Sequence, residues 1–81
     1  MFIKTQDGKA IYDTSKFIGV YIQESKFVDV DNSAYGLFLL NLGGEVAYLL
    51  GQYKRESRAT EILSELHDSM ETEAKYDMPI I

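Results

Sequence analysis

The chain's one basic cluster lies next to a tyrosine. Lys54, Arg55 and Arg58 closely follow Tyr53. Cationic side chains beside an aromatic ring could contact a small anion, or the phosphates and bases of a nucleic acid. Glu56 interrupts the cluster, however, and the formal net charge of the whole chain is −5. We therefore favour a solvated connector as the interpretation of this stretch, with ligand contact as the alternative.

The sequence contains no recognisable catalytic or metal-binding set. His67 is the only histidine and cysteine is absent, so a typical zinc site cannot be built. The acids nearest to His67 are Asp68 and Glu71, which are predicted to be ordinary surface positions on the same helix. No nucleophile–base pair and no cofactor motif is evident. We expect a protein that is not an enzyme and that needs no cofactor.

Two glycine- or aspartate-rich stretches also fail as ligand motifs. Residues 29–33 resemble the start of a calcium loop, but Ala34 replaces the required glycine and Leu40 the bidentate glutamate. Gly43 and Gly44 are not followed by the lysine and helix of a phosphate-binding loop. The first stretch is predicted to be a strand that enters a turn, and the glycine pair a hairpin turn.

Composition restricts the class of protein and of partner. The 81 residues suffice for one domain, and the pI is near 4.6. Excess negative charge makes nucleic acid an unlikely partner and opposes adhesion to anionic membranes. Apolar runs such as residues 37–40 are far shorter than the roughly 20 residues that span a bilayer. A cytoplasmic protein without membrane contact is the expectation, which the absence of cysteine fits.

Residues 57–74 are predicted to form the only helix. Apolar side chains recur there at three- and four-residue spacing, which places them on one stripe. Ser57 is the expected N-cap, and Glu71 and Glu73 should weaken the last turn because they face the negative end of the helix dipole. The stripe consists of Ala59, Ile62, Leu63, Leu66 and Met70, with Ala74 as a further candidate.

Short apolar runs between turn residues predict the strands. An Asp-Gly pair at residues 7–8 is a strong hairpin signal. The expected fold is α+β, with an antiparallel sheet of five or six short strands followed by one C-terminal helix packed on it. A strongly curled, barrel-like sheet is the alternative. The expected strands are residues 2–5, 10–12, 17–23, 27–31, 35–42 and 46–53.

An apolar tail, residues 76–81, follows the predicted single domain of residues 1–75. Its apolar side chains are Tyr76, Met78, Ile80 and Ile81. Exposed apolar tails are unusual in a monomer, so these four residues are the candidate interaction residues. The tail could fold back on its own sheet, add to a sheet edge or groove of a second copy or another protein, or be disordered.

Two short motifs carry a family resemblance. They are Thr-Gln-Asp-Gly at residues 5–8 and Leu-Gly-Gln-Tyr at residues 50–53, the second leading into a helix with Ala59, Ile62 and Leu63. Through these motifs, which lie in the first and last thirds of the chain, the sequence resembles small uncharacterised proteins of Firmicutes and their mobile elements. The resemblance implies a sheet-plus-helix fold and a bacterial or phage origin. It implies no activity and no functional residue.

These observations lead to two functional hypotheses. The first is a non-catalytic protein-binding or self-assembly module. Three features favour it: the aromatic content, the short-stranded sheet and the apolar tail. Its partner would be another protein or a second copy of the chain. The alternative is a small regulatory domain that binds a small molecule or a nucleic acid through Tyr53, Lys54, Arg55 and Arg58.

Overall fold

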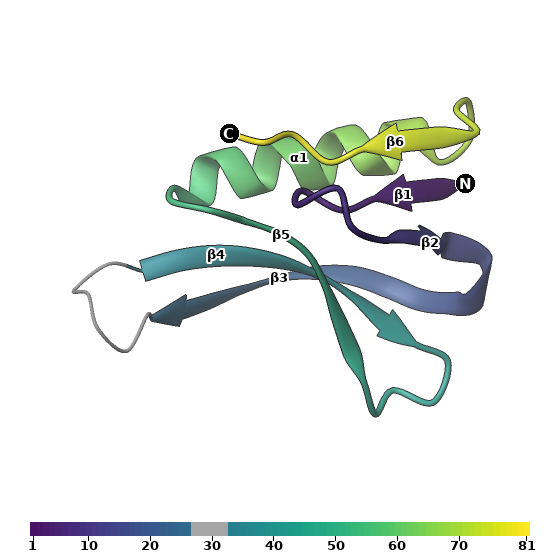
Figure 1. Ribbon diagram of the computed structural model, residues 1–81, viewed down its shortest axis with the longest axis horizontal. Coiled ribbons are helices and arrows are strands. Elements are labelled where there is room, and N and C mark those ends of the chain that lie inside the picture. Colours follow the sequence, from purple (N-terminus) through teal and green to yellow (C-terminus); the bar gives the residue numbers. More distant parts are fainter. Residues whose placement is uncertain (27–32) are drawn as a thin grey trace.

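The part of the chain that the structure describes folds into six strands and one α-helix (Figure 1). The computed structural model describes residues 1–26 and 33–81. The predicted α+β class and the single C-terminal helix are confirmed. In chain order, the elements are β1 (Phe2–Lys4), β2 (Ile11–Asp13), a 3-10 helix (Thr14–Lys16), β3 (Phe17–Lys26), β4 (Ser33–Asn41), β5 (Ala47–Tyr53), α1 (Glu56–Ser69) and β6 (Lys75–Asp77).

The strands form two sheets of three, ordered β2-β1-β6 and β3-β4-β5. The prediction of one sheet of five or six strands is therefore wrong, and neither sheet is a closed barrel. The 3-10 helix that follows β2 redirects the chain, since the Asp13 side chain accepts a hydrogen bond from the Ser15 amide and ends the strand. As a result β3 pairs with β4 rather than with β2. The strand expected at residues 27–31 lies outside the described residues.

Strand β6 joins β1 in parallel, which the sequence did not predict. Phe2 lies opposite Lys75, and Lys4 lies opposite Asp77. The pairing continues at both ends, because the Phe2 amide donates to the Ala74 carbonyl at 2.9 Å and the Met78 amide to the Lys4 carbonyl at 3.0 Å. The first residues of the tail therefore fold back on a strand of the same chain (Figure 1). This is one of the three arrangements considered for the tail.

Helix α1 packs on one face of the β3-β4-β5 sheet. The predicted stripe is confirmed at its centre, where Ala59, Ile62 and Leu66 are fully buried. The helix nevertheless begins at Glu56, with Arg55 as an N-cap that makes no side-chain bond, so the Ser57 cap was wrong. It also ends at Ser69 rather than at residue 74, because the chain must turn there to lay β6 on β1. The core that α1 covers contains Ile3, Leu37, Leu39, Leu50, Tyr53 and Met78.

A bulge in β5 positions the end of that strand. Leu37 lies opposite Gly51, but Phe38 lies opposite Leu49, so Leu50 is an extra residue without a partner on β4. The Leu50 side chain is buried in the core, and its carbonyl accepts a hydrogen bond from the Gln6 amide at 2.8 Å. The bulge thus connects the turn after β1 with the last residues of β5.

Candidate functional site

The turn between β1 and β2 is built by local hydrogen bonds. The predicted hairpin is confirmed, with Lys4 opposite Ile11. The Asp7 carboxylate accepts from the Thr5 hydroxyl at 2.6 Å and from the Lys9 amide at 2.9 Å. These two bonds lower the pKa of Asp7. Gly8 has φ of 73°, a conformation that glycine adopts readily. The turn therefore holds residue 6 in a fixed position.

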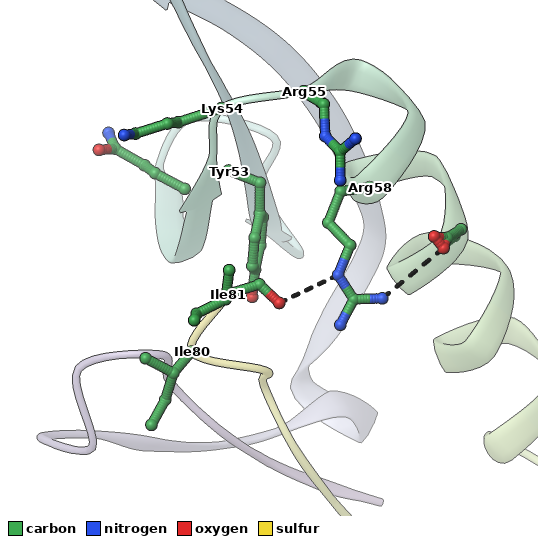
Figure 2. Close-up of a pocket in the computed structure, with 8 residues that line it drawn as sticks. Tyr53, Lys54, Arg55, Arg58, Ile80 and Ile81 are labelled. Carbon is green, nitrogen blue, oxygen red and sulfur yellow. Dashed lines mark hydrogen bonds and ion pairs between the residues drawn. The ribbon is translucent and has the colours of Figure 1, made fainter.

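Three side chains from three elements hold the main chain of residues 79–81. The Tyr53 hydroxyl donates to the Pro79 carbonyl at 2.6 Å. The Gln6 side-chain amide donates to the Ile80 carbonyl at 2.8 Å, and Arg58 Nε donates to the main-chain oxygen of Ile81 at 3.0 Å. Figure 2 shows the Arg58 bond. We call Gln6, Tyr53 and Arg58 the carbonyl clamp. Because it engages only main-chain oxygens, it does not depend on the side chains of residues 79–81.

The side chains of the clamped segment differ sharply in burial. Met78, just before it, is a core residue with 4% of its surface exposed, whereas Ile80 is 80% exposed and Ile81 is 89% exposed. The side chains of both isoleucines point away from Arg58 in Figure 2. The clamp therefore fixes a stretch of chain whose two apolar side chains face solvent.

An open pocket of about 770 Å³ lies where β5 leads into α1. Residues that the sequence analysis placed in two separate groups meet here. Tyr76 and Met78 do not line the pocket: the Tyr76 hydroxyl donates to a Glu65 carboxylate oxygen at 2.6 Å, and Met78 belongs to the core. The members of the two groups that do line the pocket are Tyr53, Lys54, Arg55, Arg58, Ile80 and Ile81 (Figure 2).

The pocket carries more positive than negative charge. Arg58 forms a 3.8 Å ion pair with Glu61, the one acidic side chain in the lining. Among the described residues, Lys54 and Arg55 form no ion pair. Arg55 and Arg58 both line the pocket, and in Figure 2 the side chain of Lys54 extends away from them. Arg55 and Arg58 together thus provide a local cationic surface on a protein whose net charge is −5.

Both tyrosines near the tail are held in the neutral, hydrogen-bond-donating form. Burial raises the pKa of Tyr53 to about 12, and the charge of Arg58 opposes this shift. Burial also raises the pKa of Tyr76, and the hydrogen bond to Glu65 and that residue's charge raise it further. Tyr53 therefore acts as a hydrogen-bond donor at neutral pH and not as a phenolate base.

The remaining candidates lie elsewhere or outside the described residues. His67 is exposed on α1, 3.8 Å from the Asp68 carboxylate, and does not line the pocket. No group of three or more metal-ligating side chains occurs in the part of the chain that the structure describes. The calcium-like stretch falls within residues 29–33, most of which are not described. Gly43 and Gly44 lie in the predicted turn between β4 and β5.

Sequence reasoning missed Gln6 as a site residue. Besides its bond to Ile80, its side chain accepts from the Gln52 amide at 2.8 Å and donates to the Gln52 carbonyl at 3.0 Å. A glutamine in a turn has no characteristic spacing relative to a residue 46 positions later, so its role depends on the tertiary fold. The one available signal was its place within the Thr-Gln-Asp-Gly motif.

Comparison of the chain with models of protein families, with curated proteins and with solved structures finds no match. In the described part of the chain, no helix combines the length and the apolar character that a membrane crossing requires. The geometry of the pocket and of the clamped tail therefore carries the functional argument.

Proposed function

We propose that the protein is a non-catalytic protein-binding or self-assembly module, cytoplasmic and of a bacterium or mobile element. The origin rests on the motif resemblance alone. One observation carries the functional proposal: the carbonyl clamp holds the main chain of residues 79–81, yet Ile80 and Ile81 are 80% and 89% exposed. A disordered apolar tail would say little about binding, whereas two fixed apolar side chains form a defined contact surface.

Fixing these side chains before binding favours association. Full burial of an isoleucine side chain contributes about 1.5–3 kcal/mol, and association normally loses part of such a gain to the ordering of flexible chain. The bonds from Gln6, Tyr53 and Arg58 already order the main chain here. A partner that covers Ile80 and Ile81 would therefore retain most of the gain from their burial.

The charges beside the isoleucines indicate the chemistry of the partner. Arg55 and Arg58 line the same pocket as Ile80 and Ile81. A segment that combines apolar side chains with Asp or Glu would complement both features. We therefore propose an acidic peptide segment with apolar anchors as the partner, either from another protein or from a second copy.

Selection from a displayed library of random peptides tests this proposal. The full chain is the target, and selected peptides are then measured by isothermal titration calorimetry. We expect acidic, apolar peptides whose Kd rises at least about tenfold, or by about 1.4 kcal/mol, for the double variant Ile80→Ser/Ile81→Ser. Ile11→Ser is the matched control, because Ile11 is an exposed isoleucine outside the pocket. No enrichment, together with a strictly monomeric chain, would overturn the proposal.

The second candidate is a small regulatory domain that binds a small molecule or a nucleic acid through residues 53–58. The pocket volume of about 770 Å³ favours it, since small-molecule sites commonly measure about 300–1,000 Å³. Titration with citrate, followed by NMR chemical shifts, would perturb the amides of Arg55 and Arg58 if a small anion binds. A single-stranded oligonucleotide would instead produce binding that weakens steeply with added salt. Unchanged spectra in both titrations would remove this candidate.

A further inference from the structure

We infer that β3 is a homodimer interface at which two copies pair edge to edge in antiparallel orientation. This inference rests on the self-assembly form of the proposed function and names its surface and its partner. Strand β3 is an edge strand of the β3-β4-β5 sheet and spans ten residues, Phe17–Lys26. Within the described chain it pairs only with β4, so its outer edge presents main-chain groups that are free to pair.

The other sheet edges are short or covered. Strands β2 and β6 are three residues long. Strand β5 is longer, but Gln6 covers the last part of its edge: the Gln6 main chain bonds to Leu50, and its side chain bonds to both main-chain groups of Gln52. Among the described residues, Gln6 therefore blocks the edge of β5 at Leu50 and Gln52, whereas β3 pairs with β4 alone.

The first part of β3 lacks the charged residues and prolines that commonly protect an edge strand. Residues 17–22 read Phe-Ile-Gly-Val-Tyr-Ile, without charge or proline. Natural edge strands are commonly protected by lysine, proline or inward-pointing charge. Ile18, the extra residue of a bulge, is 56% exposed, and Gly19 is exposed as well. The bulge at Ile18 is the one protective feature of this stretch, and Glu24 and Lys26 carry the only charges of β3, so residues 19–23 form an uncharged open edge that is expected to pair.

The charges at the ends of the strand favour a second copy as the partner. Lys16 precedes the uncharged stretch and Glu24 follows it. Antiparallel pairing about a twofold axis at Val20 brings Lys16 of each copy near Glu24 of the other, so the strand complements itself. The same axis places Tyr21 of one copy opposite Gly19 of the other, and an aromatic ring over an edge glycine is a favourable cross-strand pair.

A shallow apolar pocket beside β3 would be covered in this dimer. It measures about 210 Å³ and is lined in part by Phe17, Ile18, Val20, Leu39 and Met70. Met70 is 43% exposed. Twofold pairing at Val20 places Ile22 of the second copy opposite Ile18, next to this pocket. Dimerisation would thus bury apolar surface in addition to forming main-chain hydrogen bonds.

Gly19→Lys is the test variant, because it should block pairing without disturbing the monomer. A Cβ at Gly19 meets no atom within 4 Å, and the residue's φ lies outside the left-handed region. In the dimer, two lysines at this position would be diagonal neighbours about 7–8 Å apart and would also displace Tyr21. Gly43→Lys is the matched control: a Cβ there meets only the Glu45 side chain, at 3.9 Å, in the turn after β4.

Sedimentation velocity of the full chain, from micromolar to millimolar concentration, gives the readout. We expect a wild-type dimer whose dissociation constant rises at least about tenfold in Gly19→Lys and is unchanged in Gly43→Lys and in Ile80→Ser/Ile81→Ser. Melting curves recorded at concentrations where the chain is monomeric should show that every variant is folded. A monomeric wild type, or a dimer that Gly19→Lys leaves intact, would overturn pairing through β3. A dimer lost only in the Ile80/Ile81 variant would overturn it too, while keeping self-assembly through the tail. A wild type that forms the β3 dimer but binds no selected peptide would count against the proposed tail surface and not against β3.

Discussion

The side chain of Gln6 pairs with the main chain of Gln52 as a neighbouring strand would. Its side-chain oxygen accepts from the Gln52 amide at 2.8 Å, and its side-chain nitrogen donates to the Gln52 carbonyl at 3.0 Å. The same nitrogen donates to the Ile80 carbonyl at 2.8 Å. One side chain in the turn between β1 and β2 therefore joins the edge of the second sheet to the tail.

Replacing Gln6 should weaken the fold far more than replacing Gln52. Gln6→Ala removes three side-chain hydrogen bonds, two of them partly buried, and we expect a loss of about 2 kcal/mol in the free energy of unfolding. Gln52→Ala keeps the same bonds, because Gln52 contributes only main-chain atoms, and should change stability little. Urea denaturation measures both variants. Equal losses would mean that the side chain of Gln6 does not join the sheets.

Gly51 should tolerate no side chain, because Gln6 approaches it closely. A Cβ at this position would lie 3.0 Å from Gln6 Cβ and 3.0 Å from the Tyr53 hydroxyl oxygen. Gly51→Ala must therefore displace Gln6, and we expect a destabilisation of about 1–3 kcal/mol in chemical denaturation. Gly19→Ala is the control, since its Cβ enters open space. In a double-mutant cycle, Gly51→Ala and Gln6→Ala should be non-additive; full additivity would contradict this explanation.

Tyr53 should make the fold sensitive to alkaline pH. Its pKa is raised from 10.0 to about 12, so the folded state binds the phenolic proton more tightly than the unfolded chain does. The resulting stability is fully present below pH 10 and is lost as pH rises from 10 through about 12. We expect Tyr53→Phe to be less stable at pH 8, because it loses the bond to Pro79, but to lose less stability above pH 10. The test is the free energy of unfolding of both proteins, measured across this pH range. Equal pH slopes for the wild type and Tyr53→Phe would refute the raised pKa of Tyr53.

Part of the fold was accessible from sequence because it depends on local signals. The Asp-Gly pair predicted the first hairpin, where Gly8 has φ of 73°. The helical stripe predicted the burial of Ile62 and Leu66. The spacing of apolar and turn residues also gave β3, β4 and β5 to within a few residues. In each case neighbours in sequence determine the conformation.

The features that depend on distant contacts were not predicted. The division into two sheets follows from the 3-10 helix after β2, and the parallel pairing of β6 joins residues more than seventy positions apart. Periodicity carries no information on such partners. The sequence did single out both Arg58 and Ile81 as candidates, but it could not indicate that they meet in one pocket. Gln6 was overlooked for the same reason.

The proposed binding surface depends on whether residues 79–81 are held while the isoleucine side chains face solvent. The ¹H–¹⁵N heteronuclear NOE of the Ile80 and Ile81 amides measures this order directly. We expect values close to that of Tyr76 in β6 for the wild type, and a clear fall in the double variant Tyr53→Phe/Arg58→Gln, which removes two of the three clamp bonds. Values near zero in the wild type would contradict the clamp, and with it the fixed apolar surface proposed for partner binding.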